Sequence, residues 1–507
     1  MELELLDNGF PYCETVLETV LTREETLETI VPDACPDIDA VLSTEARVCL
    51  RQREADVGAA LFGGTVRCSI LYQPEGRQAL EALETGLDFR CSAEQEGITP
   101  DSGVFAVPRV TIAETRTINP RKVLVRVGIA IEVQVSRVQR CALACGVADP
   151  DSWKLQQLLT QREGCFALEY AQRAFSFSDD LTLPGSKPPI DEVLRLRCDP
   201  FSGDARVVGG KLIFKGGVSV HLLYRTPEGE TEEAEFELPM SQVLDVPSAP
   251  EQAAFQLELL LTDWSLSQPS LDGRTLALDL ELLAQAIVSE TRQLTLLTDV
   301  YSTAYATAPR VERVCLSQLV RQEVLHQSER ALVESAGEVR RVCDTSLLVG
   351  ETGAAREEGQ LILSAQCVME ATYQEASGQY GSVARKLTVA VRVPAQEGAE
   401  CRFTVTPERV DAVETGGGLE LRAAVAFHLM LLERQPETVV TALTVEEASA
   451  GAAEGQPSIV LRQVGAGETL WQIAKTYSAT RQEIMDANGM EEETPQAGQL
   501  LLIPRKR

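Results

Sequence analysis

The sequence predicts a mainly β protein, with tandem repeated all-β, sandwich-like domains followed by a small β-α-α-β domain. Three observations predict this class. Short apolar segments that end in tyrosine recur along the chain, a long stretch of alternating residues follows each of them, and the C-terminal part contains two helix-capping patterns between short β-prone segments. At 507 residues the chain is several times longer than a typical domain, so three or four hydrophobic cores are expected.

The tyrosine-ending segments define the repeat. They are residues 61–72 (LFGGTVRCSILY), 213–224 (IFKGGVSVHLLY) and 362–373 (ILSAQCVMEATY). Their final tyrosines lie 152 and 149 positions apart, so the period is about one domain. In the first segment Val66, Cys68 and Ile70 occur at every second position, which is the pattern of a half-buried strand.

Each of these segments is followed by a polar turn and, about fifty residues later, by a second alternating stretch. The turns occupy residues 73–76, 226–229 and 374–378. Because proline and glycine favour chain reversal, each segment should form a hairpin with a following strand. The second stretches are residues 123–135, 275–286 and 419–431. Leucine and alanine would also allow helices in the last two, but the valines and isoleucines of the first favour strands.

A proline-containing, acidic arm precedes the first strand in two of the three repeats. It comprises residues 31–42 (VPDACPDIDAVL) and residues 183–194 (LPGSKPPIDEVL). Each is expected to be extended and to end in a turn. The third repeat lacks this arm and has diverged. The aspartates of the arms are not accompanied by the glycine and the distal glutamate of an EF-hand loop, so no metal site is predicted there.

Composition restricts the partners and the compartment. The formal net charge of −30 opposes sequence-independent binding to nucleic acid or anionic lipid. The acidic segment Met1–Phe10 lacks the order of a secretory signal, and the most apolar stretch, residues 423–432, is about half as long as a membrane span. Neither export by that route nor a membrane span is expected. Thirteen cysteines without repeated close spacing favour free thiols in a reducing compartment, which predicts a cytoplasmic protein.

Catalytic and cofactor motifs are not found in the sequence. The histidines His221, His326 and His428 leave few candidates for a nucleophile pair, and no phosphate loop, HExxH helix or GxSxG turn occurs. Cys141 and Cys145 could be metal ligands but have no second pair nearby, so structural roles are favoured. The sequence therefore predicts a protein that is not an enzyme and that uses no cofactor or metal.

Several local signals coincide in the C-terminal segment. In order, they are a β-prone segment at 460–464, capping boxes at 469–472 and 480–483, a glycine at 489 and a strand at 499–503 before Pro504. In a capping box the threonine hydroxyl accepts from the third helical amide, and the side chain there accepts from the threonine amide. Glycine favours the left-handed conformation that ends a helix. The predicted order is β-α-α-β.

This segment (GETLWQIAKTY…TRQEIMDANGM…GQLLLIP) resembles the LysM domain family over its whole length. In that family the ligand groove lies between the loop that opens the first helix and the loop that leads into the last strand, here residues 467–470 and 493–497. The resemblance implies a glycan- or partner-binding site at Gly467, Glu468, Thr469, Leu470, Trp471, Thr494, Pro495 and Gln496. Core positions are expected at Ile473, Ala474, Ile484 and Leu502. Helical spacing leaves open whether Trp471 packs inside or presents its face.

The repeats, their arms, their tyrosine-ending hairpins and the LysM segment together resemble the SPOCS-domain spore coat morphogenetic proteins of the SipL type. The resemblance implies a non-catalytic scaffold of endospore coat assembly, made in the mother cell and gathered at the forespore surface. Its LysM domain would dock a protein, the coat basement-layer ATPase called stage IV sporulation protein A. The alternative is a binding protein for peptidoglycan, an N-acetylglucosamine polymer, in the spore cortex or cell wall. A hydrolase targeted by LysM is disfavoured because the repeats supply no catalytic constellation.

The repeat period and the composition also predict the domain boundaries. We expect SPOCS-like β domains at 1–155, 156–308 and 309–447, the last of them divergent, then a linker at 448–457 and a LysM domain at 458–505. The linker is inferred from its small and acidic residues, which interrupt the alternating pattern.

Overall fold

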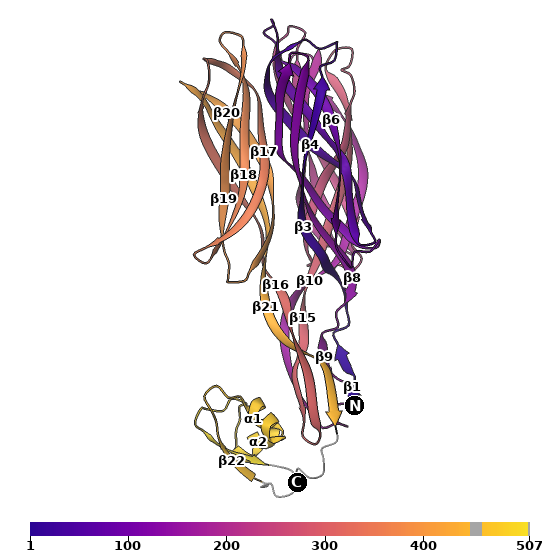
Figure 1. The fold of residues 1–507 in the computed structure, drawn as a ribbon, viewed down its shortest axis with the longest axis vertical. Coiled ribbons are helices and arrows are strands. Elements are labelled where there is room, and N and C mark those ends of the chain that lie inside the picture. The colour runs from indigo at the N-terminus through magenta and orange to yellow at the C-terminus, as the bar shows by residue number, and fades with distance from the viewer. Residues whose placement is uncertain (447–458, 505–507) are drawn as a thin grey trace.

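The computed structural model describes residues 1–446 and 459–504. It contains a head of three β units lying side by side, a narrow stem of strands that leave the head at one end, and a small module with two short helices at the foot of the stem (Figure 1). The predicted fold class, repeated all-β domains followed by a β-α-α-β domain, is confirmed. The predicted linker, residues 448–457, lies outside the described residues.

Head unit 1 is a sandwich of two antiparallel three-stranded sheets. One sheet has the order β3-β8-β7 and the other has the order β4-β5-β6. The strands are β3 (Pro11–Ile30), β4 (Ile38–Asp56), β5 (Ala59–Pro74), β6 (Glu81–Glu94), β7 (Gly103–Asn119) and β8 (Lys122–Arg140). Alternate side chains of the two central strands, such as Val66 and Ile70 of β5 and Val125 and Val127 of β8, fill the space between the sheets.

Head units 2 and 3 repeat this topology. In unit 2 the sheets are β10-β15-β14 and β11-β12-β13, and in unit 3 they are β16-β21-β20 and β17-β18-β19. The strands of unit 2 are β10 (Leu155–Thr182), β11 (Glu192–Val208), β12 (Lys211–Arg225), β13 (Thr231–Asp245), β14 (Ala254–Leu266) and β15 (Thr275–Ser302). Those of unit 3 are β16 (Ala306–Glu334), β17 (Val339–Glu357), β18 (Gln360–Glu375), β19 (Tyr380–Pro394), β20 (Glu400–Thr415) and β21 (Gly418–Glu446). The divergent third repeat therefore keeps the architecture of the other two.

Both kinds of predicted strand are present. The tyrosine-ending segments lie in β5, β12 and β18, and each forms a hairpin with the next strand. The second alternating stretches lie in β8, β15 and β21, so the strand interpretation is confirmed over the helical alternative. Each of these is the central strand of its sheet and is hydrogen-bonded on both sides. Their leucines and alanines are buried by tertiary packing, which overrides helix propensity.

The recurring tyrosines hold the segment that joins the two sheets of each unit. The Tyr72 hydroxyl donates a hydrogen bond to the carbonyl of Pro36 in the arm of unit 1 (3.3 Å), and the Tyr224 hydroxyl donates to Pro188 in the arm of unit 2 (3.1 Å). In unit 3, residues 335–338 replace the arm, and the Ala336 amide donates to the hydroxyl of Tyr373 (3.1 Å). A buried hydroxyl needs a partner, and each tyrosine finds one in this connection.

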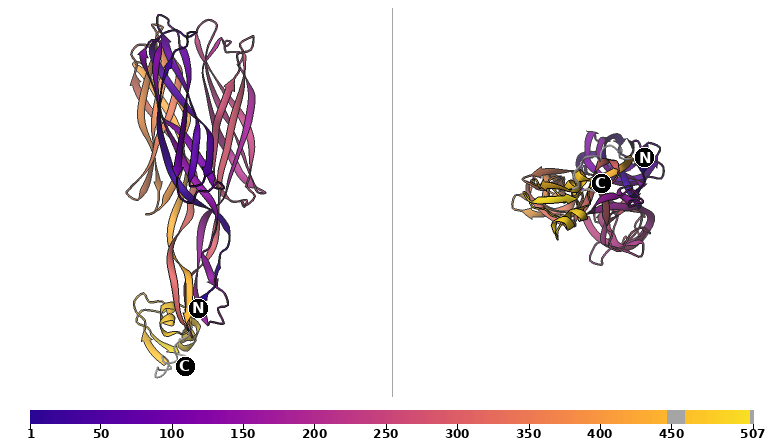
Figure 2. Two further views of the ribbon diagram at one scale, coloured as in Figure 1. Left: turned by 45° about the vertical axis from the view of Figure 1, so that its right-hand side comes forward. Right: turned by 90° about the horizontal axis from the view of Figure 1, so that it is seen from below.

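The three units pack around a common axis, which the view from below in Figure 2 shows. A buried apolar cluster lies where they meet, and it takes side chains from every unit, namely Leu42, Leu71, Leu80, Leu194, Leu223, Cys343 and Tyr380. Leu42, Leu194 and Cys343 occupy equivalent positions, since each directly follows the valine that pairs with the recurring tyrosine. Burial of this apolar surface, worth about 25 cal/mol per Å², favours association of the units.

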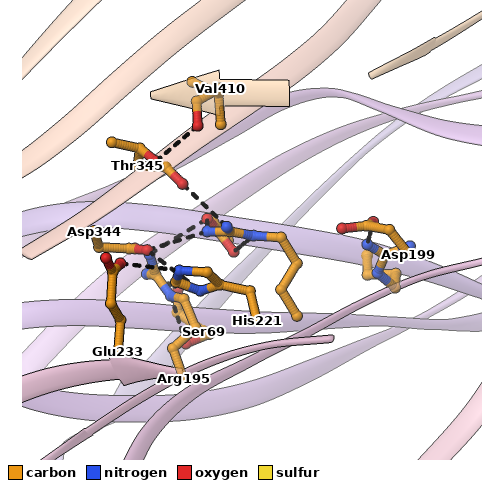
Figure 3. A network of polar contacts seen from close by, with 11 residues as sticks. Ser69, Arg195, Asp199, His221, Glu233, Asp344, Thr345 and Val410 are labelled. Carbon is orange, nitrogen blue, oxygen red and sulfur yellow. Dashed lines mark hydrogen bonds and ion pairs between the residues drawn. The ribbon is translucent and has the colours of Figure 1, made fainter. Parts of the chain in front are cut away.

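A buried ion-pair network lies beside this cluster (Figure 3). Arg195 of unit 2 donates from Nη1 to Oδ2 of Asp344 in unit 3 (2.7 Å) and from Nη2 to the carbonyl of Ser69 in unit 1 (3.0 Å). Arg197 contacts both Asp344 and Glu45 of unit 1. The side chains of Arg195 and Asp344 are 0% and 2% exposed. Each charge would be costly to bury alone, so the network requires all three units to be in place.

The stem consists of strand ends that extend beyond the head. The first parts of β10 and β16 pair there with the last parts of β15 and β21, respectively. Strand β1 (Glu2–Leu3) pairs with β21, and β2 (Leu5–Asp7) pairs with β9 (Ala144–Val147). Buried leucines and valines from these strands form a separate stem core. Residues 2–3, which belong to the first predicted domain, thus add a strand to the sheet of unit 3. The stem therefore brings the N-terminal residues next to the end of β21.

All thirteen cysteines lie within residues 1–446, and none of them forms a disulfide. Burial raises the pKa of Cys68 to about 12 and that of Cys367 to about 11. Such thiols stay protonated near neutral pH and are poor nucleophiles. No helix within the described residues is both long and apolar enough to cross a membrane.

Arg195→Met is expected to destabilise the protein by about 3–5 kcal/mol, because it leaves the buried carboxylate of Asp344 without its closest cation. Urea unfolding followed by circular dichroism measures this loss. Arg51→Met is the matched control: Arg51 also links units 1 and 2, through Asp263 (2.7 Å), but the two side chains are 53% and 40% exposed, so its loss should cost less than about 1 kcal/mol. Equal losses in the two variants would contradict a special role for the buried pair.

Glu370 of β18 should make stability depend on pH. Burial raises the pKa of Glu370 from its ordinary value of 4.5 to about 7, although Arg195 lowers it in part. The folded state therefore holds this proton more tightly, so its contribution to stability is present below pH 4.5 and is lost as the pH rises through about 7. Glu370→Gln should reduce the decline of the urea midpoint between about pH 5 and about pH 8. The exposed Glu414→Gln should not, and an unchanged decline in Glu370→Gln would refute the assignment.

Candidate functional site

The C-terminal module folds in the predicted order. Strand β22 (Ile459–Gln463) is followed by α1 (Leu470–Tyr477), α2 (Arg481–Asn488) and β23 (Leu500–Pro504). The two strands are antiparallel, and one face of their sheet packs on the helices through Leu501 and Ile503. The module therefore has a small core of its own.

Local sequence signals account for both helices. At the start of α1 the Thr469 hydroxyl accepts from the amide of Gln472 (3.3 Å), and the Thr469 amide donates to Oε1 of Gln472 (2.9 Å). The same reciprocal pair joins Thr480 and Glu483 at α2. Helix α2 ends at Gly489, which has a φ of 61°, a conformation that glycine adopts without strain. Both capping boxes and the glycine stop are confirmed.

The predicted core is confirmed with one correction. Ile473, Ala474 and Ile484 are buried in the module, but Leu502 is not in its core, and its neighbours Leu501 and Ile503 are. The prediction for Leu502 was wrong because successive residues of a strand face opposite sides, and four apolar residues in succession do not reveal which side is inward.

The two loops of the predicted groove meet at their bases. The amide of Val464 donates to the carbonyl of Gln499, and the amide of Gly498 donates to the carbonyl of Val464, both at 2.9 Å. Glu468 accepts from the amide of Gly465 and from Arg462, each at 2.9 Å. These bonds lower the pKa of Glu468, with the backbone bond having the larger effect. The Glu468 carboxylate therefore closes the turn at residues 465–468 by accepting a hydrogen bond from the Gly465 amide.

The remaining predicted site residues differ in exposure. Gly467, Thr469, Thr494 and Gln496 are exposed, Pro495 is half-buried, and Leu470 is only 1% exposed because its side chain packs in the module core. In the second loop the amide of Gln496 donates to Oε1 of Gln499 (2.9 Å). The surface available to a ligand here therefore comes from the backbone and polar side chains of the loops, and the binding role of these residues stays a prediction.

Trp471 packs against the stem. Its indole Nε1 donates to Oδ2 of Asp299 (2.7 Å), and its ring meets that of Tyr301 edge-on, with centroids 4.9 Å apart. Lys475 of the same helix donates to Oδ1 of Asp299 (2.6 Å), and the Tyr301 hydroxyl donates to the carbonyl of Ala479 (2.7 Å). Trp471 is 6% exposed. The sequence left open whether this side chain packs or presents its face, and the structure shows that it packs.

The stem residues Asp299 and Tyr301 were missed by sequence reasoning. They lie at the end of β15, and 170 or more positions separate them from their partners in the module. The alternation of β15 marks Tyr301 as an inward residue, but no local pattern indicates what covers it. Figure 1 shows the module beside the foot of the stem, where this contact holds it.

The histidines belong to the head and not to the module. His221 contacts Glu233 (3.2 Å), His326 contacts Glu408 (2.7 Å), and His428 contacts Thr406 (3.1 Å). Burial lowers the pKa of His428. Within residues 1–446 and 459–504, no group of three or more His, Cys, Asp or Glu side chains is placed to hold a metal ion.

Two family models match the chain. The LysM domain model matches residues 463–504, and the model described as SipL, SPOCS domain matches residues 37–118 and 189–267. These last two segments run from β4 to β7 in unit 1 and through β11 to β14 in unit 2. No curated protein and no solved structure matches the chain.

These matches place the chain among proteins built from binding and scaffold-type domains, since neither SPOCS nor LysM is a catalytic family. In particular, its architecture combines SipL-type SPOCS domains with a C-terminal LysM domain, as the sequence resemblance indicated. Together they indicate a spore-associated protein that carries a module of the peptidoglycan-binding type. Unit 3 lies outside the matched segments but has the same strand order.

Carbodiimide, which joins a lysine to a carboxylate only when the two are in contact, should couple Lys475 to Asp299. Peptide mass spectrometry identifies the product, and Asp299→Asn should abolish it. The pair Lys187 and Glu232 of unit 2, 3.1 Å apart, provides an internal positive control. Coupling of the control pair without any Lys475–Asp299 product would show that the module does not rest on the stem.

Proposed function

We propose that this protein is a non-catalytic scaffold in the assembly of the bacterial endospore coat. Its LysM domain docks a coat basement-layer protein, an ATPase of the stage IV sporulation protein A type, while the acidic head holds or spaces other components. The proposed location is the mother-cell cytoplasm at the forespore surface. This proposal combines the SPOCS and LysM matches with the position of the module.

The observation that carries the proposal is the contact between the module and the foot of the stem. Asp299 accepts from both Trp471 and Lys475, which holds the module at the opposite end of the stem from the head. A molecule with its binding module at one end and a large folded body at the other is suited to linking two components. The charge of −30 disfavours nucleic acid as one of them.

Removal of residues 458–507 should abolish binding to purified stage IV sporulation protein A from the same bacterium, measured by biolayer interferometry. The full chain and its Leu271→Glu variant, which changes a fully exposed residue of the head, should bind equally well. Equal binding by the truncated and full chains would refute docking through the LysM domain.

A second candidate is binding to peptidoglycan in the spore cortex or cell wall. The exposure of Thr494 and Gln496 in the predicted groove favours it, because loops with free polar groups can bind sugar hydroxyls. In that case the chain should sediment with insoluble peptidoglycan, and Thr494→Arg should raise the Kd obtained from the sedimentation curve at least about tenfold, a loss of about 1.4 kcal/mol. Ala487→Arg, on the exposed side of α2, is the matched control. No sedimentation of the full chain would exclude this candidate.

A further inference from the structure

The outer face of the module sheet is apolar and exposed. Ile459, Leu461 and Leu500 are 56%, 71% and 66% exposed. They share one face, because Ile459 lies opposite Pro504, Leu461 opposite Leu502, and Gln463 opposite Leu500. Large aliphatic side chains gathered on one side of a two-stranded sheet are costly to leave in water.

The two edges of this sheet differ in their hydrogen bonding. In an antiparallel pair, residues bond alternately toward the partner strand and away from it. Val464, which directly follows β22, bonds to Gln499 and Gly498, which directly precede β23. Counting back in steps of two, Arg462 and Val460 also face β23, so Leu461 directs its amide and carbonyl outward, as does Leu502 on the opposite strand. On β23 that outward pair is satisfied: the Leu502 amide donates to Oδ1 of Asn488 (2.8 Å), and Nδ2 of Asn488 donates to the Leu502 carbonyl (2.7 Å).

Within residues 1–446 and 459–504, nothing pairs with the corresponding edge of β22. Strand β23 is the sole strand that pairs with β22 within the described residues, and no described group bonds to the outward amide of Leu461. A strand edge of this kind is a template for another extended chain. The stem does not supply one, because its contact with the module is made through α1 and the turn after it. The exposed aliphatic face therefore adjoins a strand edge that no described residue covers.

The chemistry of this surface selects among ligands. A sugar presents hydroxyl groups on most of its surface, and the aliphatic side chains of Ile459, Leu461 and Leu500 can neither bond to hydroxyls nor provide an aromatic ring on which a sugar stacks. The backbone of Leu461 alone would have to hold it. An extended peptide with alternate apolar side chains matches both features. Its backbone would bond to the edge of β22, and its apolar side chains would cover the aliphatic face.

We propose that β22 accepts an extended strand of a protein partner by β-augmentation, through the outward amide and carbonyl of Leu461 and the aliphatic face formed by Ile459, Leu461 and Leu500. The inference rests on the proposed function and deepens it, since it names the surface and the kind of segment through which the LysM domain docks its protein. This surface is distinct from the two loops of the predicted groove.

Two substitutions of Leu461 test the strand edge and the aliphatic face separately. Leu461→Pro removes the outward amide while leaving the bonds between β22 and β23, since proline is tolerated where a strand edge faces solvent. Leu461→Glu keeps the amide and places a charge on the aliphatic face. With purified stage IV sporulation protein A as the probe, each variant of the full chain should bind at least about tenfold more weakly than the wild type. Leu271→Glu controls for the change of leucine to glutamate.

The outcomes are distinguishable. If the full chain binds and the chain without residues 458–507 does not, the proposed function stands. If both Leu461 variants then bind as well as the wild type, this inference is overturned. No binding by the wild-type chain would overturn both. Light scattering that finds a wild-type dimer and a Leu461→Pro monomer would identify a second copy of the chain as the occupant and would also overturn the choice of partner. The carbodiimide product between Lys475 and Asp299 should form in both variants as it does in the wild type, which shows that the module remains folded on the stem.

Discussion

The arrangement of the molecule depends on a buried ion pair between Arg195 and Asp344 at the axis of the head. These residues and Ser43 occupy one equivalent position in the three units, two residues after the valine that pairs with the recurring tyrosine. Three identical side chains would place three like charges, or none, at the axis. Because this position holds serine in unit 1, arginine in unit 2 and aspartate in unit 3, the charges are balanced at the axis when units 2 and 3 lie next to each other. An arrangement of the units that separated Arg195 from Asp344 would leave a buried charge without its partner, which is strongly destabilising.

The stem and the position of the module follow from this arrangement. Strands β10, β15, β16 and β21 are 28 to 29 residues long, and they belong to the head over one part and to the stem over the other. The stem core therefore assembles only when units 2 and 3 lie side by side. It includes Leu3 near the N-terminus and Val445 near the end of β21, so it also ties the ends of the head together. The foot of β15 carries Asp299 and Tyr301, which hold the module through Trp471.

Local order was predictable from the sequence, and long-range pairing was not. The turns after the tyrosines, the alternating strands and both capping boxes depend on residues a few positions apart, and their physics is contained in short windows. The contacts of Arg195 with Asp344 and of Asp299 with Trp471 join residues 149 and 172 positions apart. Nothing in the periodicity of either segment identifies its partner. The same limit applies to Leu502, because a run of apolar residues does not say which face of a strand is inward.

The most direct test of the account is whether units 1 and 3 meet across the axis in solution. The turn after β5 and the turn after β18 are in contact, with Nε2 of Gln78 donating to the carbonyl of Ser377 (3.0 Å) although 299 positions separate them. A photo-reactive benzoylphenylalanine at position 78 should cross-link, within one chain, to the peptide that contains Ser377, as identified by mass spectrometry. Cross-links confined to unit 1, or formed between different chains, would contradict closure of the three units around the axis.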